Sequence, residues 1–190
     1  MKKILMFFYL GVVFITGCAY LGYLKDPFEN IPNFYKVSEN LYRGGQPKEA
    51  GFRFLKQLGI KTVVSLRGKN YHVELERKII ENMGMNFFSI PLSVYQQPEE
   101  KQVLEFLEIL LKREYQPVFV HCDSGRDRTG AMIAMYRVVV DGWTIKQAYR
   151  EARKFGFFPY RSREAPLKMF IHQLKDKKIY FEKARQLKNE

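Results

Sequence analysis

Cysteine is nearly absent from this sequence, whose 190 residues include only Cys18 and Cys122. Two cysteines can form one disulfide bond at most. Their settings argue against that pairing, because Cys18 ends an apolar N-terminal run and Cys122 lies in a stretch rich in glycine and arginine. With 46% hydrophobic residues the chain can bury one core of ordinary size, so we expect it to need neither a disulfide nor a metal ion for stability.

Other features are also missing. The sequence has no internal repeat and no low-complexity segment, and nothing in it is typical of a nucleic-acid-binding module. We therefore expect no nucleic-acid partner. Positive charge, by contrast, is in excess, with a formal net charge of +12. Solvated lysines and arginines on helix surfaces account for such an excess, and so does attraction to anions such as phosphorylated substrates or anionic lipids.

The N-terminus is typical of an export signal. Residues 1–3 carry two lysines, and Ile4 to Ile15 is apolar over the length of a signal-peptide core. The run ends in Ile15-Thr16-Gly17-Cys18, which resembles the bacterial lipoprotein box, where the chain is cut before the cysteine and the cysteine is then lipidated. An uncleaved membrane helix over Ile4 to Leu24 is the alternative. Both interpretations predict a membrane-anchored protein on the extracytoplasmic side, because positive residues stay in the cytoplasm.

The chain then divides into a lipoprotein-type signal peptide (1–17), a lipid-anchored tether (18–32), one domain (33–174) and a polar C-terminal tail (175–190). Strands and helices alternate within the domain. We expect strands over Phe34–Tyr42, Lys61–Leu66, Asn86–Leu92 and Pro117–Val120. We expect helices over Lys48–Leu58, Val73–Met83, Pro98–Arg113, Thr129–Val140, Thr144–Phe155 and from Ala165 onward. This order predicts an α/β fold with a central, mostly parallel sheet of four to five strands flanked by helices.

The segment after Val120 carries the chemistry, since ligands bind beyond the carboxyl ends of such strands. It reads His121-Cys122-Asp123-Ser124-Gly125-Arg126-Asp127-Arg128-Thr129-Gly130. A loop that leads from a strand into a helix N-terminus turns backbone N–H groups inward and forms a cradle for an anion. Gly125 permits the tight turn, and Arg128 offers a planar, charged fork to two phosphoryl oxygens.

Cys122 is the candidate nucleophile of this cradle. The amide dipoles, together with Arg126 and Arg128, favour its thiolate, which can displace an ester oxygen from phosphorus. A small buried cysteine with a structural role at a strand end is the alternative.

The loop resembles the signature of the protein tyrosine and dual-specificity phosphatases, which is His-Cys, five residues, Arg, and then Ser or Thr. Supporting stretches at 40–47, 59–66 and 117–122 extend the resemblance over roughly residues 33–174. It implies a dual-specificity-phosphatase-like fold, a phosphocysteine intermediate on Cys122 and assistance from Thr129 when the sulfur leaves. It also implies that His121 orders the loop by hydrogen bonds. The residues expected to bind the substrate are His121, Asp123, Ser124, Gly125, Arg126 and Arg67.

The spacing excludes a second class of cysteine-loop enzymes. Sulfurtransferases of the rhodanese type place their loop arginine five residues after the cysteine. That position is Asp127 here, and Arg128 comes sixth.

The sequence lacks an aspartate at the position where such phosphatases usually have their general acid. They usually protonate the leaving oxygen from an aspartate on a loop after an earlier strand, but this chain has no aspartate between Asp26 and Asp123. The corresponding segment offers Glu99 and Glu100, although the first turn of a helix also favours acidic residues there.

Asp127 is the other candidate acid, and we favour it. The pattern Cys-x-x-Gly-x-Asp-Arg resembles that of myotubularin lipid phosphatases and of a secreted bacterial group acting on phosphotyrosine and phosphoinositides. In both, the loop aspartate is the proposed acid. An ion pair with Arg126 or Arg43 would instead hold Asp127 ionised and make it unsuitable.

The sequence predicts a phosphomonoesterase of dual-specificity type that needs no cofactor. Its substrate stays open among phosphoproteins, phosphoinositides and soluble inositol phosphates. Arg126, Arg67 and Arg161 hint at more than one phosphate on the substrate, although a surface charge accounts for each equally well. The alternative is a phosphate-binding pseudophosphatase module with little or no turnover, which has the cradle but lacks a usable acid.

Overall fold

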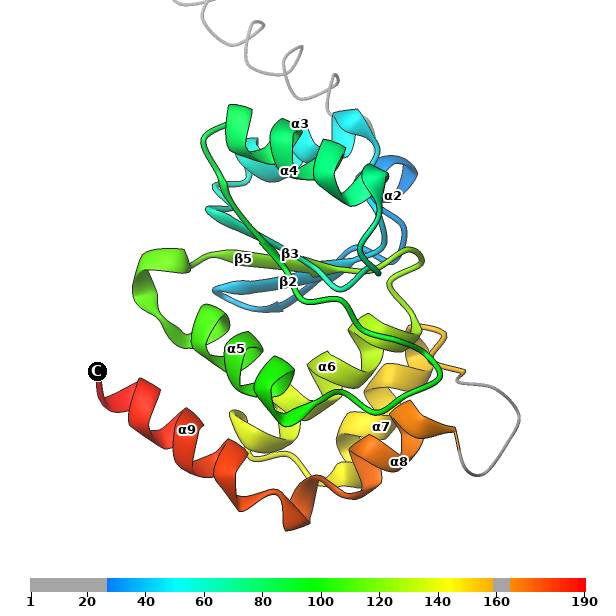
Figure 1. Cartoon of the computed structure of the whole chain (residues 1–190), viewed down its shortest axis with the longest axis vertical. Helices are drawn as coiled ribbons and strands as arrows, with labels where there is room; N and C mark the ends of the chain where they lie inside the picture. Colours follow the sequence, from blue (N-terminus) through cyan, green and yellow to red (C-terminus); the bar gives the residue numbers. More distant parts are fainter. Residues whose placement is uncertain (1–26, 159–164) are drawn as a thin grey trace, which may run out of the picture.

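A five-stranded sheet lies at the centre of the computed structural model, which describes residues 27–158 and 165–190 (Figure 1). The strand order is β1-β2-β5-β3-β4. The strands are β1 (Tyr35–Ser38), β2 (Leu41–Gly44), β3 (Thr62–Ser65), β4 (Asn86–Ser89) and β5 (Val118–His121). Only the β1–β2 pair of these strands is antiparallel. The predicted α/β fold with a mostly parallel sheet is confirmed.

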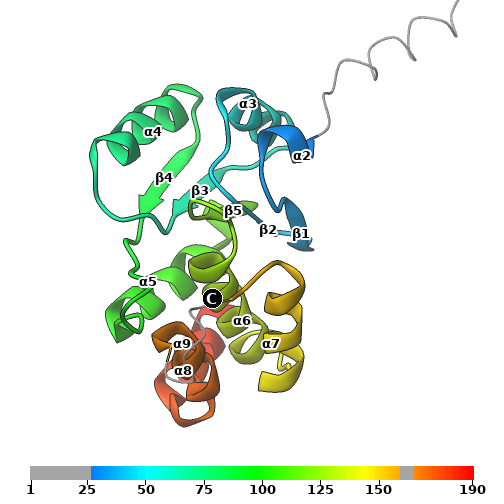
Figure 2. The same cartoon turned by 90° about the vertical axis from the view of Figure 1, so that its right-hand side faces the viewer.

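The two central strands are buried on both faces. Every residue of β3 and β5 is buried, as expected for apolar runs in a parallel sheet covered on both sides. Figures 1 and 2 show the two covering layers. One layer holds α2 (Pro27–Asn30), α3 (Glu49–Gln57) and α4 (Tyr71–Asn82). The other holds α5 (Glu100–Leu111), η1 (Arg113–Tyr115), α6 (Asp127–Val139), α7 (Ile145–Lys154), α8 (Pro166–His172), η2 (Leu174–Asp176) and α9 (Lys178–Asn189).

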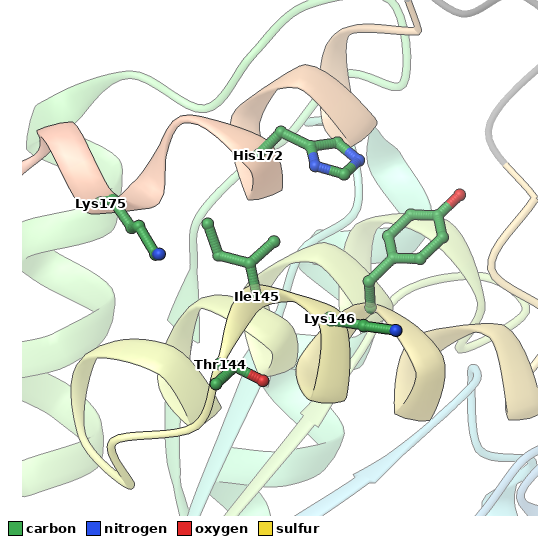
Figure 3. Close-up of a pocket in the computed structure, with 6 residues that line it drawn as sticks. Thr144, Ile145, Lys146, His172 and Lys175 are labelled. Atoms are coloured by element: carbon green, nitrogen blue, oxygen red, sulfur yellow. The ribbon is translucent and has the colours of Figure 1, made fainter.

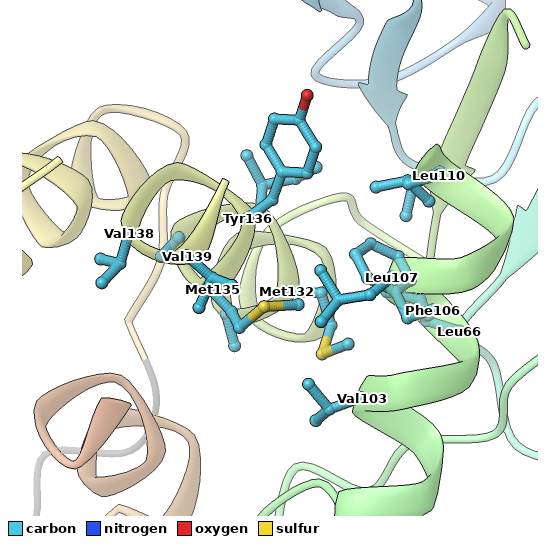
Figure 4. Close-up of a cluster of buried hydrophobic side chains, with 14 of the residues drawn as sticks. Leu66, Val103, Phe106, Leu107, Leu110, Met132, Met135, Tyr136, Val138 and Val139 are labelled. Carbon is cyan, nitrogen blue, oxygen red and sulfur yellow. The ribbon is translucent and has the colours of Figure 1, made fainter. Parts of the chain in front are cut away.

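Helix α6 is the central helix of the thicker layer. Every residue from Thr129 to Val139 is buried, because α7 and α8 pack against α6 and its apolar side chains share one buried cluster with residues of α5 and the sheet. Figure 4 shows the contact with α5, where Val103, Phe106 and Leu107 face α6 side chains such as Met132 and Met135. This packing fixes the N-terminus of α6, where the cysteine loop ends.

The first expected strand is in fact a hairpin. The sequence predicts one strand over Phe34–Tyr42 followed by a turn that starts at Arg43. The structure instead turns at Glu39 and Asn40, and β2 continues through Arg43 and Gly44. The reason is long-range pairing, since Arg43 and Gly44 are in parallel register with Val120 and His121 of β5. This register brings β2 to the start of the cysteine loop.

The polar C-terminal stretch is not a free tail, which corrects the boundary expected at residue 174. Residues Lys178–Asn189 form α9, which packs against α5. Tyr180, Ala184 and Leu187 recur at helical spacing and are at most 5% exposed. The amphipathic pattern is short and interrupted by charged residues, and for that reason the composition alone suggested a tail.

The expected signal peptide, Cys18 and most of the tether lie outside the described residues, as does Arg161. Within residues 27–158 and 165–190, no helix has the length and apolar character needed to cross a membrane.

Candidate active site

The cysteine loop connects the carboxyl end of β5 to the N-terminus of α6, as predicted. Cys122 follows the last strand residue directly and is 2% exposed. The backbone of Gly125 has a φ of +70°. A Cβ atom at that position would lie 2.5 Å from the carbonyl carbon of Gly44, so only glycine fits both the conformation and the space.

Three consecutive backbone carbonyl groups of the loop accept hydrogen bonds from residues outside the loop. The backbone N–H of Gln46 donates to the carbonyl of Asp123 (2.9 Å), and the Asn33 side-chain amide donates to the carbonyl of Ser124 (2.8 Å). Arg43 Nη2 donates to the carbonyl of Gly125. In a trans peptide the next N–H points opposite to the carbonyl, so these bonds direct the N–H groups of residues 124–126 toward the inside of the loop. The anion cradle is therefore held in shape by the hairpin and its flanking residues.

From the sequence, Arg43 is expected at the site only as a possible ion-pair partner of Asp127, and its hydrogen bond to the loop backbone was not predicted. Its side chain is 1% exposed, lies 4.3 Å above the ring of Phe155, and carries the loop contact to Gly125. Burial lowers the pKa of Arg43 to about 10, although the charges of Glu151 and Cys122 oppose the shift. At neutral pH the guanidinium therefore stays protonated and adds positive potential near Cys122. The sequence signal for Arg43 is its place at the start of the stretch from Arg43 to Pro47, for which the sequence predicts a turn.

His121 lies where it can order the loop. Its Nδ1 is 3.2 Å from the Cys122 carbonyl oxygen, its ring stacks on Phe119, and its Nε2 is 2.8 Å from Glu76 Oε1. Both His121 and Glu76 are buried. Glu76 was missed, although the helical spacing of Val73, Glu76 and Ile80 puts a charged residue on the apolar face of α4. A carboxylate in such a position needs a polar partner, and that need is a usable sequence signal.

Thr129 and Asp127 occupy the first turn of α6. The Thr129 hydroxyl is fully buried and has no hydrogen-bond partner among the described residues. The Asp127 carboxylate is half-buried and accepts a hydrogen bond from the backbone N–H of Phe158 (2.9 Å). The alternative to a role of Asp127 as general acid is an ion pair of Asp127 with Arg126 or Arg43. Arg43 donates to the loop carbonyl instead.

The glutamates considered as alternative acids lie at the start of α5. The Glu99 backbone N–H donates to Gln102 Oε1 at 2.8 Å in a capping box, and Glu100 is the first helical residue. Both positions agree with the interpretation that these glutamates stabilise the N-terminus of α5.

The loop arginines differ in their surroundings. Arg67 follows β3, and Arg67 Nε donates to Asp123 Oδ1 at 2.7 Å. Arg128 Nη2 donates to Asp123 Oδ2. Arg126 is exposed and its side chain lies beside Gly156, after α7. The structure thus brings Arg67, Arg126 and Arg128 to the same loop, and Asp123 links Arg67 to Arg128.

A hollow lies away from this loop (Figure 3). The hollow lies between the N-terminal part of α7, the end of α8 and η2, and it is lined by Thr144, Ile145, Lys146, Tyr149, His172 and Lys175. The start of α7 follows the C-terminal end of α6, so this hollow is at the opposite end of α6 from the cysteine loop.

A Cys-x5-Arg loop between a buried parallel strand and a helix N-terminus, on a sheet covered on both faces, defines the class of cysteine-based phosphatases. The chain belongs within it to the family described as "DSP-PTPase phosphatase fused to NAD+ Kinase", whose model matches residues 28–165.

Individual relatives agree with this assignment. The dual specificity protein phosphatase TpbA of Pseudomonas aeruginosa is 33% identical over 126 residues, which cover 66% of this chain and 55% of TpbA. The inositol diphosphatase DSP4 of Arabidopsis thaliana is 28% identical over 127 residues, which cover 65% of this chain and 63% of DSP4. The chain thus spans less than two thirds of the length of either relative.

Solved structures show the same fold. The core catalytic domain of the PP-IP phosphatase SIW14 from S. cerevisiae has a TM-score of 0.69 and 26% identity, over 83% of this chain and 95% of that one. P. aeruginosa TpbA has a TM-score of 0.66 and 27% identity, over 83% and 94% of the two chains.

Proposed function

We propose that this chain is a phosphomonoesterase that acts through a phosphocysteine intermediate on Cys122. The observation that carries the proposal is that the carbonyls of residues 123–125 accept hydrogen bonds from outside the loop, which turns the next N–H groups inward, where they can bind an anion beside Cys122. Such a preorganised ring of donors, with Arg128, stabilises the charged equatorial oxygens of a phosphoryl group in transfer.

The reaction has two displacements. In the first, the Cys122 thiolate forms a bond to phosphorus as the ester P–O bond breaks, and Asp127 gives its proton to the leaving oxygen. In the second, the Asp127 carboxylate takes a proton from water as the water oxygen bonds to phosphorus and the S–P bond breaks, which releases inorganic phosphate and returns Cys122 to the thiolate. The buried Thr129 hydroxyl, which lacks a partner among the described residues, stabilises the departing sulfur in this proposal.

Relatives act on two kinds of substrate. One solved structure shows TpbA in complex with pTyr, whereas DSP4 is an inositol diphosphatase. Two features of this chain favour an aryl phosphate. Tyr71, Tyr95 and Phe158 are each more than half exposed, and they lie in or beside loops that follow the carboxyl ends of strands or border Asp127. In addition, Arg67, one of the arginines expected to hold a second phosphate, is bound to Asp123.

A turnover panel tests this proposal. Phosphotyrosine peptides, phosphoinositides and inositol phosphates are compared by release of inorganic phosphate. We expect kcat/KM for the phosphotyrosine peptide to exceed that for the inositol phosphates by about 2- to 10-fold, the size of one or two aromatic contacts. A preference for inositol phosphates would contradict the substrate assignment, and binding without turnover of any substrate would favour the pseudophosphatase alternative.

We also propose export and lipid anchoring through Cys18. The supporting observation is the apolar run that ends at Ile15-Thr16-Gly17-Cys18. Inhibition of lipoprotein signal peptidase should leave a longer precursor, and Cys18→Ser should remove lipid labelling and prevent cleavage at this site. A Cys18→Ser protein that is processed to the same length as the wild type would contradict the lipoprotein signal. An unprocessed wild-type chain that stays in the membrane would support the uncleaved helix.

A further inference from the structure

Asp123, the residue directly after Cys122, holds two arginines with one carboxylate. Its Oδ2 accepts a hydrogen bond from Arg128 Nη2, and its Oδ1 accepts one from Arg67 Nε at 2.7 Å. The Asp123 side chain is 57% exposed, whereas the side chains of Arg67 and Arg128 are each 16% exposed. The carboxylate therefore covers both guanidinium groups from the solvent side of the loop.

A carboxylate and a phosphoryl group compete for the same donors. Each offers a guanidinium fork two oxygens in suitable geometry. Arg128 is the residue that the Cys-x5-Arg spacing assigns to the phosphoryl oxygens, and here one of its nitrogens is already bound to Asp123. An incoming phosphoryl group must take this donor from the carboxylate.

We propose that the Asp123 carboxylate competes with the phosphoryl group for Arg128. In the free protein the carboxylate binds both Arg128 and Arg67, and when an oxyanion binds to Arg128 the carboxylate stays bound to Arg67 alone. The inference deepens the proposed function, on which it rests.

The surroundings of the two arginines explain why Arg67 keeps the carboxylate. Arg67 Nη1 donates to Gln46 Oε1 at 2.5 Å and lies 3.8 Å from Glu76 Oε2, so two further residues hold Arg67 in place. Arg128 Nη1 makes a longer contact of 3.4 Å to the carbonyl of Leu66. Arg67 is the fixed partner, and Arg128 is the one free to turn to a ligand.

The charge of Asp123 also sets which ligands fit. Partial burial raises the pKa of Asp123, but the hydrogen bond and charge of Arg128 and the charge of Arg67 outweigh it, so the pKa lies below its usual value. The side chain is therefore ionised at neutral pH. An anionic carboxylate at the entrance repels a second phosphate beside the one in the cradle, so Asp123 selects a single, isolated phosphoryl group.

The test is Asp123→Asn, which keeps the size of the side chain and removes its charge. Tungstate and inorganic phosphate are titrated into the full chain by calorimetry. We expect both to bind on the order of tenfold more tightly, because a competitor and a like charge are removed. The gain should be larger for inorganic pyrophosphate, which carries the second phosphate. Binding needs no turnover, so this result can be read even if the proposed catalysis fails.

The matched control is Asp141→Asn. Asp141 pairs with Arg137 near the C-terminal end of α6, at the far end of a 13-residue helix from the cysteine loop. It changes the net charge equally and should leave oxyanion affinity unchanged.

A second variant distinguishes competition between Asp123 and the oxyanion for Arg128 from a role of Asp123 in positioning Arg128. With Arg67→Ala, Asp123 has only Arg128 to bind, so oxyanions should bind more weakly, and Asp123→Asn in that background should restore the affinity. Unchanged or weaker oxyanion binding by the single Asp123→Asn variant would overturn the proposal and make Asp123 a residue that positions Arg128.

Discussion

Replacing Cys122 with serine is expected to abolish turnover and to leave oxyanion binding intact. A serine hydroxyl is not ionised by amide dipoles and arginine charges at neutral pH, so the bond to phosphorus does not form. We expect kcat to fall on the order of 10⁴-fold or more, as for the loss of a nucleophile in other covalent enzymes. The cradle is built by backbone groups and by contacts from Asn33, Arg43 and Gln46, none of which this change touches. Phosphate release from an aryl phosphate and tungstate calorimetry measure the two properties.

The chain offers a matched control in its other cysteine. Cys18→Ser makes the same chemical change at the first residue of the expected tether and should leave kcat and tungstate binding as in the wild type. Acid quenching during turnover should trap a phosphoenzyme in the wild type and in Cys18→Ser but not in Cys122→Ser. Hydrolysis by Cys122→Ser within tenfold of the wild type would rule out the covalent mechanism.

Asp127→Asn should depress the hydrolysis of esters with poor leaving groups. A positioned general acid is worth typically about 10²–10⁴-fold, and the leaving oxygen needs its proton most when it is a strong base. We expect nearly the full loss on alkyl phosphates and a small loss on activated aryl phosphates. Asparagine keeps the side-chain oxygen that accepts the Phe158 N–H, so the start of α6 should retain its shape. The measurement is kcat/KM across a series of leaving groups.

The controls for this series are Glu99→Gln and Glu100→Gln. Both residues lie at the N-terminus of α5, where they stabilise the start of the helix, and neither change should alter the dependence on leaving group. An equal loss on all substrates for Asp127→Asn would assign Asp127 to loop structure alone. A loss of activity in a glutamate variant that grows with the pKa of the leaving group would instead place the acid on the β4–α5 loop.

Local patterns predicted the elements that bear the chemistry. The expected bounds of β5 and α6 lie within two residues of the observed ones. A short apolar run indicates a buried strand and a long apolar segment indicates a buried helix, and both patterns can be recognised from residues that are close in the sequence. The cysteine loop between them followed directly. The anion cradle could also be anticipated, since a strand–loop–helix junction with glycine and arginine has a known local geometry.

The support of that loop could not be predicted in the same way. Asn33 and Arg43 bond to Ser124 and Gly125 across 91 and 82 residues of sequence, and such pairings leave no local periodic signal. The hairpin was missed for a related reason, since the register of β2 is set by β5 rather than by its own residues. Asp123 lay within the motif, but its link to Arg67 depends on two strand ends meeting at one edge of the sheet.

The bonds from the hairpin to the three loop carbonyls also limit how this active site can be transferred. A graft of the segment from His121 to Gly130 onto another strand–helix junction would carry the nucleophile and the arginine but would lose the donors of Asn33, Arg43 and Gln46. A neighbouring segment with any side chain in place of Gly45 would also crowd the loop, because a Cβ atom there would lie 2.8 Å from the Asp123 carbonyl oxygen. For protein engineering, the smallest unit that can be exchanged between members of this fold is therefore the motif together with its N-terminal hairpin. Chimeras with a crossover between residues 46 and 121 should fail unless both parents have compatible hairpins.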